Sequence, residues 1–129
     1  MEMMIDFPQN VCVDAHFAGF TVKTDQGAPV GDGSAPTPFG LFLASIGTCA
    51  GFYVLSFCQH RGLSTENIRI IQRSETNPAT RMIERITLEI QVPPAFPEKY
   101  HAALVRAADQ CAVKKHLEQP PMIEVATKV

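Results

Sequence analysis

The side chains best suited to chemistry in this sequence are its four cysteines, Cys12, Cys49, Cys58 and Cys111. No two of them are spaced as Cys-x-x-Cys and no histidine cluster accompanies them, so the pattern argues against a zinc site. A cysteine thiolate can act as a nucleophile, and a second thiol can capture the oxidised sulfur as a disulfide. Since a lone cysteine is more often a small buried apolar side chain, reactivity has to be argued for each thiol separately.

The positions of the cysteines along the chain separate them into different environments. Cys49 and Cys58 lie nine residues apart in one apolar stretch, which at about 100° per residue puts them on opposite faces of a helix. Cys111 is followed closely by two lysines and a histidine, and such cations favour a nearby thiolate. Cys12 and Cys58 are expected to be buried apolar side chains, whereas Cys49 and Cys111 could meet if their helices pack on one small sheet.

The composition indicates one globular domain covering residues 1–129. Of these residues 46% are apolar and 19% are charged, and a chain of 14.1 kDa can bury a core without the help of disulfides. The net charge of −2 argues against nucleic acid or an anionic membrane as a partner. Because Met1–Asp6 has neither a basic nor an apolar signal region, we expect a cytoplasmic protein with reduced thiols.

One long stretch, Gly33–His60, contains no Asp, Glu, Lys or Arg and is long enough to span a bilayer. It opens with a Ser-Ala-Pro-Thr-Pro turn and carries polar side chains along its length, which favours a buried helix of a soluble domain over a membrane span. Thr37 is a suitable helix cap and Pro38 a suitable first helical residue. We therefore expect a central helix from about Pro38 to about Arg61, ended by Gly62.

The remaining periodic segments predict strands and one further helix. Alternation of apolar and polar residues indicates strands at 11–17, 20–24, 67–75, 84–92 and 122–128. A second helix is expected from about Glu98, with one apolar stripe made of Tyr100, Leu104, Ala107 and Cys111. The order ββ–α–ββ–α–β predicts an α+β fold in which a mostly antiparallel sheet packs on the long buried central helix.

Two segments that contain cysteines resemble a known family. Residues 34–49, Ser-Ala-Pro-Thr-Pro-Phe-Gly-Leu-Phe-Leu-Ala-Ser-Ile-Gly-Thr-Cys, resemble the signature of the OsmC/Ohr superfamily, the osmotically inducible and organic hydroperoxide resistance proteins. In that signature a proline opens a long apolar helix that leads to the first cysteine. Residues 107–117, Ala-Ala-Asp-Gln-Cys-Ala-Val-Lys-Lys-His-Leu, resemble the family's second-cysteine segment. The order of elements agrees as well, so the resemblance to an OsmC-like protein covers nearly the whole chain.

The resemblance implies an intertwined homodimer, in which two central helices lie between two sheets and both sites sit at the subunit interface. It implies that Cys49 is the peroxidatic thiol, which attacks an organic hydroperoxide, and that Cys111 is the resolving thiol, which closes a disulfide. A small or protein-bound dithiol would then reduce this disulfide, with no metal or other cofactor. The apolar side chains near Cys49 that could favour organic hydroperoxides are Phe39, Phe42, Phe52 and Tyr53.

The sequence departs from the pattern of the Ohr branch in the groups that activate the first cysteine. Phe39 stands where that branch has a glutamate, and no arginine precedes Arg61. Lys23, the only cation upstream of the helix, does not reproduce a guanidinium fork, and Ala112 stands where many relatives have a proline. Without the activating pair, burial in an apolar helix is expected to raise the pKa of Cys49. Candidate replacement groups are a side chain of the partner subunit, Lys114, Lys115, His116 and His60.

Three functions remain open from the sequence. The first is a thiol peroxidase that acts through Cys49 and Cys111. The second is a family member without peroxidase activity that binds a small apolar or electrophilic ligand in the interface cleft. The third is a structural module whose cysteines belong to the core, which predicts two thiols too far apart to bond and no cleft beside them.

Overall fold

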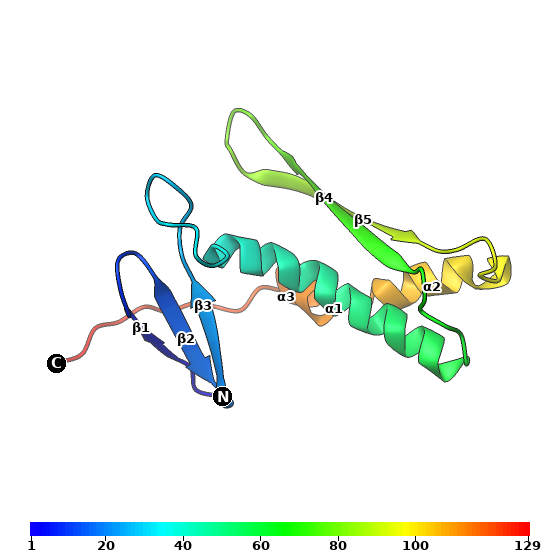
Figure 1. Cartoon of the computed structure of the whole chain (residues 1–129), viewed down its shortest axis with the longest axis horizontal. Coiled ribbons are helices and arrows are strands. Elements are labelled where there is room, and N and C mark those ends of the chain that lie inside the picture. The colour runs from blue at the N-terminus through cyan, green and yellow to red at the C-terminus, as the bar shows by residue number, and fades with distance from the viewer. The chain divides into compact units, whose positions relative to one another are not determined.

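The computed structural model describes all residues from Met1 to Val129 and has an α+β fold with antiparallel sheets (Figure 1). The chain forms two compact units, Met1–Ala44 and Ser45–Val129. A three-stranded sheet lies in the first unit, and a two-stranded sheet with the shorter helices lies in the second. The long helix α1, Pro38–His60, begins in the first unit and continues through the second.

The first unit contains an antiparallel sheet in the order β1-β2-β3. Its strands are β1 (Met4–Asp6), β2 (Val13–Phe17) and β3 (Phe20–Thr24). Ala18 and Gly19 join β2 to β3 and both have positive φ angles, 50° and 81°, as a tight hairpin turn requires. The strands expected at 11–17 and 20–24 are confirmed, whereas β1 was not predicted, because only three residues of it pair with β2.

The loop that leads into α1 is organised by a buried carboxylate, that of Asp25. Its oxygens accept hydrogen bonds from the Gln26 backbone N–H at 2.7 Å and from the Ser34 N–H and hydroxyl at 3.0 and 2.6 Å. These bonds, above all those from Ser34, lower the pKa of Asp25 from 3.8 to about 2. Asp25 thus ties the two ends of the loop together ahead of the helix.

Helix α1 has the ends that the sequence predicts. The Thr37 hydroxyl accepts a hydrogen bond from the Gly40 N–H at 3.0 Å, and Pro38 occupies the first turn. Gly62 follows the helix with a φ of +63°, and the Leu63 N–H bonds back to the Cys58 carbonyl.

In the single chain only one face of α1 is buried. Its buried residues are Ile46, Ala50, Val54, Phe57 and Cys58. Large apolar side chains on other faces remain exposed, namely Phe39, Phe42, Phe52 and Leu55. The helix is therefore apolar all round but covered by its own chain on one side.

In the second unit, strands β4 (Arg69–Thr76) and β5 (Ile83–Gln91) form an antiparallel hairpin. The Asn77 side chain closes the turn by accepting hydrogen bonds from two backbone N–H groups. As expected from the alternation, one face of β5 carries Ile86, Leu88 and Ile90, which line an apolar cavity. The other face carries charges such as Glu89, which pairs with Arg73 at 3.2 Å.

The helical region after β5 differs from the prediction. It consists of a short 3-10 turn, η1 (Glu98–Tyr100), and two separate helices, α2 (His101–Ala108) and α3 (Ala112–Glu118). The expectation that Cys111 lies within one continuous helix is wrong, because the chain leaves the helical conformation between α2 and α3.

The strand expected at 122–128 is also absent. These residues carry a strand-like pattern but pair with no other strand, and Met122, Ile123 and Val125 are exposed. Alternating apolar residues make a stable strand only where a neighbouring strand is available, and the single chain provides none here. The core of the second unit lies instead between α1, α2 and the hairpin, around Ala50, Val54, Cys58 and Leu104.

Candidate functional site

Two cysteines from separate elements of the second unit meet at one place. Cys49 lies in the middle of α1, and Cys111 lies immediately before α3, where it caps the helix. The Cys111 sulfur accepts a hydrogen bond from the Lys114 backbone N–H at 3.4 Å and lies 3.8 Å from the Ile46 carbonyl, one turn before Cys49. A sulfur thus takes the capping position that serine or aspartate usually occupies.

Backbone groups at the start of α3 stabilise a Cys49 thiolate. The Val113 N–H makes the largest contribution to lowering the pKa of Cys49, and the Cys111 thiol and the Ala112 N–H lower it further, against a smaller effect of burial. The first N–H groups of a helix have no carbonyl partner within it, so they are available for an outside acceptor. The sequence-based expectation of a raised Cys49 pKa is therefore wrong, because backbone donors take the place of a cation.

The pKa of Cys111 moves in the opposite direction. Burial raises the pKa of this thiol, and its hydrogen bond to Cys49 raises it further, against the lowering effect of the Lys114 N–H. Cys111 is only 2% exposed, whereas Cys49 is partly open to solvent. Of the two thiols, Cys49 is therefore the one that loses its proton first.

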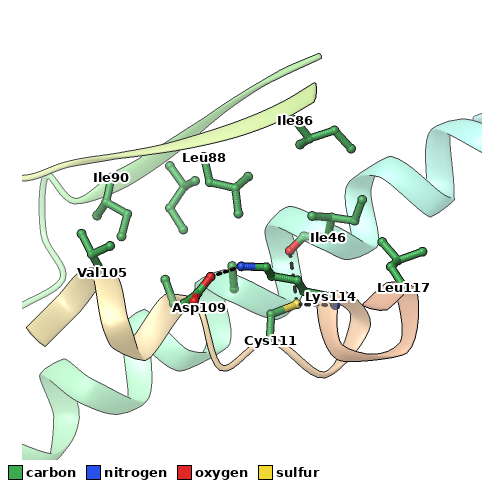
Figure 2. A pocket seen from close by; sticks show the side chains of 12 residues that line it. Ile46, Ile86, Leu88, Ile90, Val105, Asp109, Cys111, Lys114 and Leu117 are labelled. Carbon is green, nitrogen blue, oxygen red and sulfur yellow. Dashed lines mark hydrogen bonds and ion pairs between the residues drawn. The ribbon is translucent and has the colours of Figure 1, made fainter. Parts of the chain in front are cut away.

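An apolar cavity of about 370 Å³ lies next to Cys111 (Figure 2). Side chains of β5 project into it from one side, and α1, α2 and α3 form the other walls (Figure 2). Cys111 is in its wall, and an ion pair between Lys114 and Asp109 contributes the charged groups. The apolar lining consists of Ile46, Ala50, Ile70, Ile86, Leu88, Ile90, Val105, Ala108 and Leu117.

The four aromatic residues proposed from the sequence do not line this cavity. Phe39 and Phe42 pack on each other near the start of α1, with ring centres 5.5 Å apart. Phe52 and Tyr53 pack edge to face at 5.6 Å. Their expected contact with a substrate stays a prediction.

Among the candidate replacement cations, Lys114 is the one that interacts with the thiol pair. Its pKa is raised mainly by Asp109, and the Cys111 sulfur adds a small electrostatic effect. His116 and His60 instead bond through Nδ1 to backbone carbonyls of their own helices, at 2.7 Å in both cases.

The other two cysteines are buried, as predicted. Cys58 is fully buried, and burial raises the pKa of its thiol despite the nearby Arg61. Cys12 is 9% exposed and its sulfur lies 3.8 Å from the Ser34 hydroxyl. Neither thiol has the donors that surround Cys49, so both behave as small apolar side chains.

The groups that sequence reasoning missed are the Val113 and Ala112 N–H donors. Backbone donors leave no trace in residue types, and no glycine or proline marks the break before α3. The sequence signal for such a donor was Ala112, because alanine has a backbone N–H. The proline that many relatives have at this position has none and could not donate a hydrogen bond.

These features define a class of protein, an α+β chain with a paired-thiol site beside an apolar cavity. The family model for OsmC-like proteins matches residues 31–126. The chain belongs to the OsmC-like family.

Solved structures agree with this fold. A Psychrobacter arcticus protein named for osmotic stress induction and detoxification response superimposes with a TM-score of 0.73 at 15% identity, over 88% of this chain and 85% of that one. An OsmC-like protein from Mycoplasma pneumoniae gives 0.72 at 10% identity, over 92% and 87%. An OsmC-like protein of unknown function from Vibrio cholerae gives 0.58 at 9% identity, over 91% and 92%. A search of proteins with curated functions gave no significant match.

Helix α1 also meets the length and composition expected of a membrane span. Such a helix is weak evidence for a membrane protein, because the core helix of a soluble protein meets the same criteria. Since OsmC-like proteins are soluble, the family assignment favours the second interpretation, as the sequence analysis does.

Proposed function

We propose that this protein is a thiol-dependent peroxidase that reduces organic hydroperoxides through Cys49 and Cys111. The observation that carries the proposal is the asymmetry of the pair: the pKa of Cys49 is lowered and that of Cys111 is raised. A peroxidase of this type needs one thiolate to attack and one neutral thiol to follow it. The opposite directions of the two pKa changes favour Cys49 as the attacking thiolate and Cys111 as the thiol that follows it.

The reaction proceeds in three balanced steps. The Cys49 thiolate attacks the outer oxygen of the O–O bond, which gives a Cys49 sulfenic acid and an alkoxide that takes up a proton and leaves as an alcohol. The Cys111 thiol then attacks the Cys49 sulfur, which forms a disulfide and releases water. A dithiol reductant, either small or protein-bound, exchanges with this disulfide and restores both thiols while it becomes oxidised.

The cavity supports an organic substrate. Its walls are almost entirely aliphatic, and its volume of about 370 Å³ can hold the apolar part of a small hydroperoxide. Hydrogen peroxide has no apolar part, so it gains nothing from this surface.

The exposed apolar face of α1 supports a homodimer. Phe52 is 62% exposed and Leu55 39% exposed on a helix that contains no Asp, Glu, Lys or Arg. A second copy of the chain would bury these side chains and complete the site at the interface.

The test is consumption of cumene hydroperoxide in the presence of dithiothreitol. We expect turnover by the wild type, none by Cys49→Ser, and unchanged turnover by the matched control Cys12→Ser. Cys111→Ser should trap a Cys49 sulfenic acid, detected as one added oxygen in the intact mass. Equal consumption by the wild type and Cys49→Ser contradicts the proposal.

One observation supports a second candidate function: Cys49 does not line the cavity. In this alternative the protein binds a small apolar or electrophilic ligand and catalyses no peroxide reduction. It predicts that both thiols stay reduced under mild peroxide while an apolar fluorescent probe binds saturably. The third interpretation, a purely structural module, predicted distant thiols and no cleft, and neither expectation is met.

A further inference from the structure

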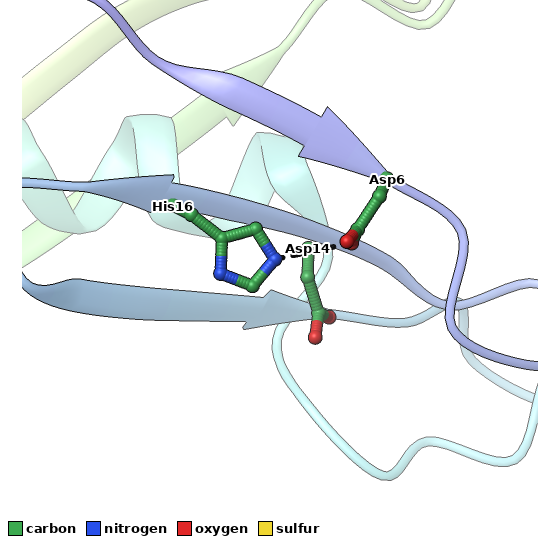
Figure 3. A group of neighbouring side chains, drawn as sticks. All are labelled: Asp6, Asp14 and His16. Carbon is green, nitrogen blue, oxygen red and sulfur yellow. Dashed lines mark hydrogen bonds and ion pairs between the residues drawn. The ribbon is translucent and has the colours of Figure 1, made fainter.

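The N-terminal sheet brings together three side chains that can ligate a metal ion. Asp6 on β1 stands directly opposite Asp14 on β2, and His16 lies two residues along β2 on the same face. One ligand atom from each residue lies within 4.8 Å of the others (Figure 3). All three residues belong to the first compact unit.

Asp14 is mostly buried, but its carboxylate oxygens keep contact with solvent. It is 9% exposed, and it forms no hydrogen bond or ion pair. Lys23 stands opposite Asp14 on β3 but makes no ion pair with it. Two like charges directly opposite each other destabilise a strand pair. A cation held between the carboxylates of Asp6 and Asp14 would relieve this repulsion.

His16 is oriented as a metal-ligating imidazole usually is. Its Nδ1 lies 3.0 Å from the Thr21 hydroxyl, and its Nε2 lies 3.1 Å from an Asp6 oxygen. In the tautomer whose Nδ1–H donates to the Thr21 hydroxyl, the Nε2 lone pair faces a carboxylate, and a cation between the two would be ligated by both. Two ligands each about 2.1 Å from a metal ion lie about 3.0–3.4 Å apart at tetrahedral or octahedral angles. The distance from Nε2 to Asp6 falls within this range.

We propose that Asp6, Asp14 and His16 bind one divalent transition-metal ion of the zinc type, with water in the remaining positions. One imidazole and two carboxylates form a nitrogen and oxygen donor set that suits such ions. The ion would neutralise Asp14 and fasten the three-residue strand β1 to β2. A direct hydrogen bond from a His16 Nε2–H to Asp6 is the competing explanation, and it leaves Asp14 without a protein partner. This site does not depend on the proposed peroxidase function.

The probe for this site is Co²⁺, titrated into the full chain with absorption spectroscopy. Cobalt distinguishes the proposed ligands from the cysteines, because thiolate ligation adds a sulfur-to-metal charge-transfer band and nitrogen or oxygen ligation does not. We expect one equivalent to bind, with visible d–d bands and no sulfur band. Asp14→Asn, which keeps the side-chain shape, and His16→Ala should each weaken binding at least about tenfold. His60→Ala, which changes a histidine outside the cluster, is the matched control and should bind as the wild type does.

A thermal measurement separates metal binding from an ordinary ion pair. Zn²⁺ should raise the melting temperature of the wild type, and it should raise that of Asp14→Asn much less. The proposal is overturned by the absence of Co²⁺ binding, by a spectrum with the sulfur band, or by unchanged affinity in His16→Ala. It is also overturned if Asp14→Asn stabilises the metal-free protein and Zn²⁺ affects neither protein.

Discussion

Replacing Val113 by proline tests the origin of the Cys49 thiolate. The Val113 N–H makes the largest contribution to lowering the pKa of Cys49. Val113 is the second residue of α3, where the N–H has no partner within the helix and a proline is tolerated. The substitution should therefore remove one donor and leave the helix in place.

The size of the effect follows from the bond that is lost. A hydrogen bond to a charged group is worth about 1.5–3 kcal/mol. Because Cys49 is partly open to solvent, water replaces some of this interaction, and the lower end of the range applies. About 1.5 kcal/mol corresponds to about a tenfold decrease in the ratio of thiolate to thiol.

The assay is the rate of iodoacetamide alkylation at Cys49, followed by peptide mass spectrometry across a pH series. Val113→Pro should react about tenfold more slowly than the wild type below the ordinary thiol pKa of 9.0, and equally fast well above it. Val113→Ala keeps the N–H and is the matched control. Ala112→Pro should slow the reaction less, because its N–H makes the smallest contribution to the lowered pKa.

Two results refute this reasoning. One is alkylation of Val113→Pro at the wild-type rate. The other is an equal loss of rate in Val113→Ala, which would trace the effect to packing of the side chain and not to the N–H. Far-UV circular dichroism on each variant checks that α3 is retained.

Three further predictions concern the cavity, the loop and the exposed helix face. Leu88→Trp fills the aliphatic cavity, so KM for cumene hydroperoxide should rise about tenfold in steady-state kinetics, while the rate with hydrogen peroxide stays unchanged. Equal losses of activity with both peroxides would disprove a role of the cavity in substrate binding. Asp25 has a folded-state pKa of about 2 against 3.8, so its stabilising effect is complete above pH 3.8 and is lost as the pH falls towards 2. Thermal melts should therefore show Asp25→Asn a few degrees less stable at neutral pH, with the gap closing between pH 3.8 and 2; a gap independent of pH contradicts the assignment. Phe52→Glu should weaken the proposed dimer at least about tenfold, because burying a phenylalanine is worth about 1.5–3 kcal/mol. The control Gln59→Glu, near the end of the same helix, should leave the dimer intact, and light scattering measures both. Equal effects of the two substitutions would place the interface elsewhere.

The elements with strong local signals could be predicted from the sequence. Thr37, Pro38 and Gly62 set the ends of α1 to within a residue, because caps and breakers act through nearby backbone groups. The alternation of apolar and polar residues also predicted strand β5. These features depend on neighbours in the sequence, so residue types were enough to find them.

The features that depend on tertiary contacts could not be predicted. The break before α3 has no glycine or proline, and it is marked only by Cys111 acting as an unusual cap. The Asp6–Asp14–His16 cluster depends on the register of β1 against β2, and β1 is too short for a periodic pattern. The pKa of Cys49 was misjudged for the same reason, because its donors come from a different segment of the chain.

The sulfur of Cys111 is a proposed reactant and also accepts a backbone hydrogen bond, so the choice of replacement decides what an experiment measures. Alanine removes the acceptor for the Lys114 N–H as well as the thiol, at a cost of about 0.5–2 kcal/mol for a lost cap. Serine removes only the thiol and supplies a better acceptor. If both Cys111→Ala and Cys111→Ser lose activity, the sulfur itself is needed. If only Cys111→Ala loses activity, the cap that positions the backbone N–H groups near Cys49 is needed.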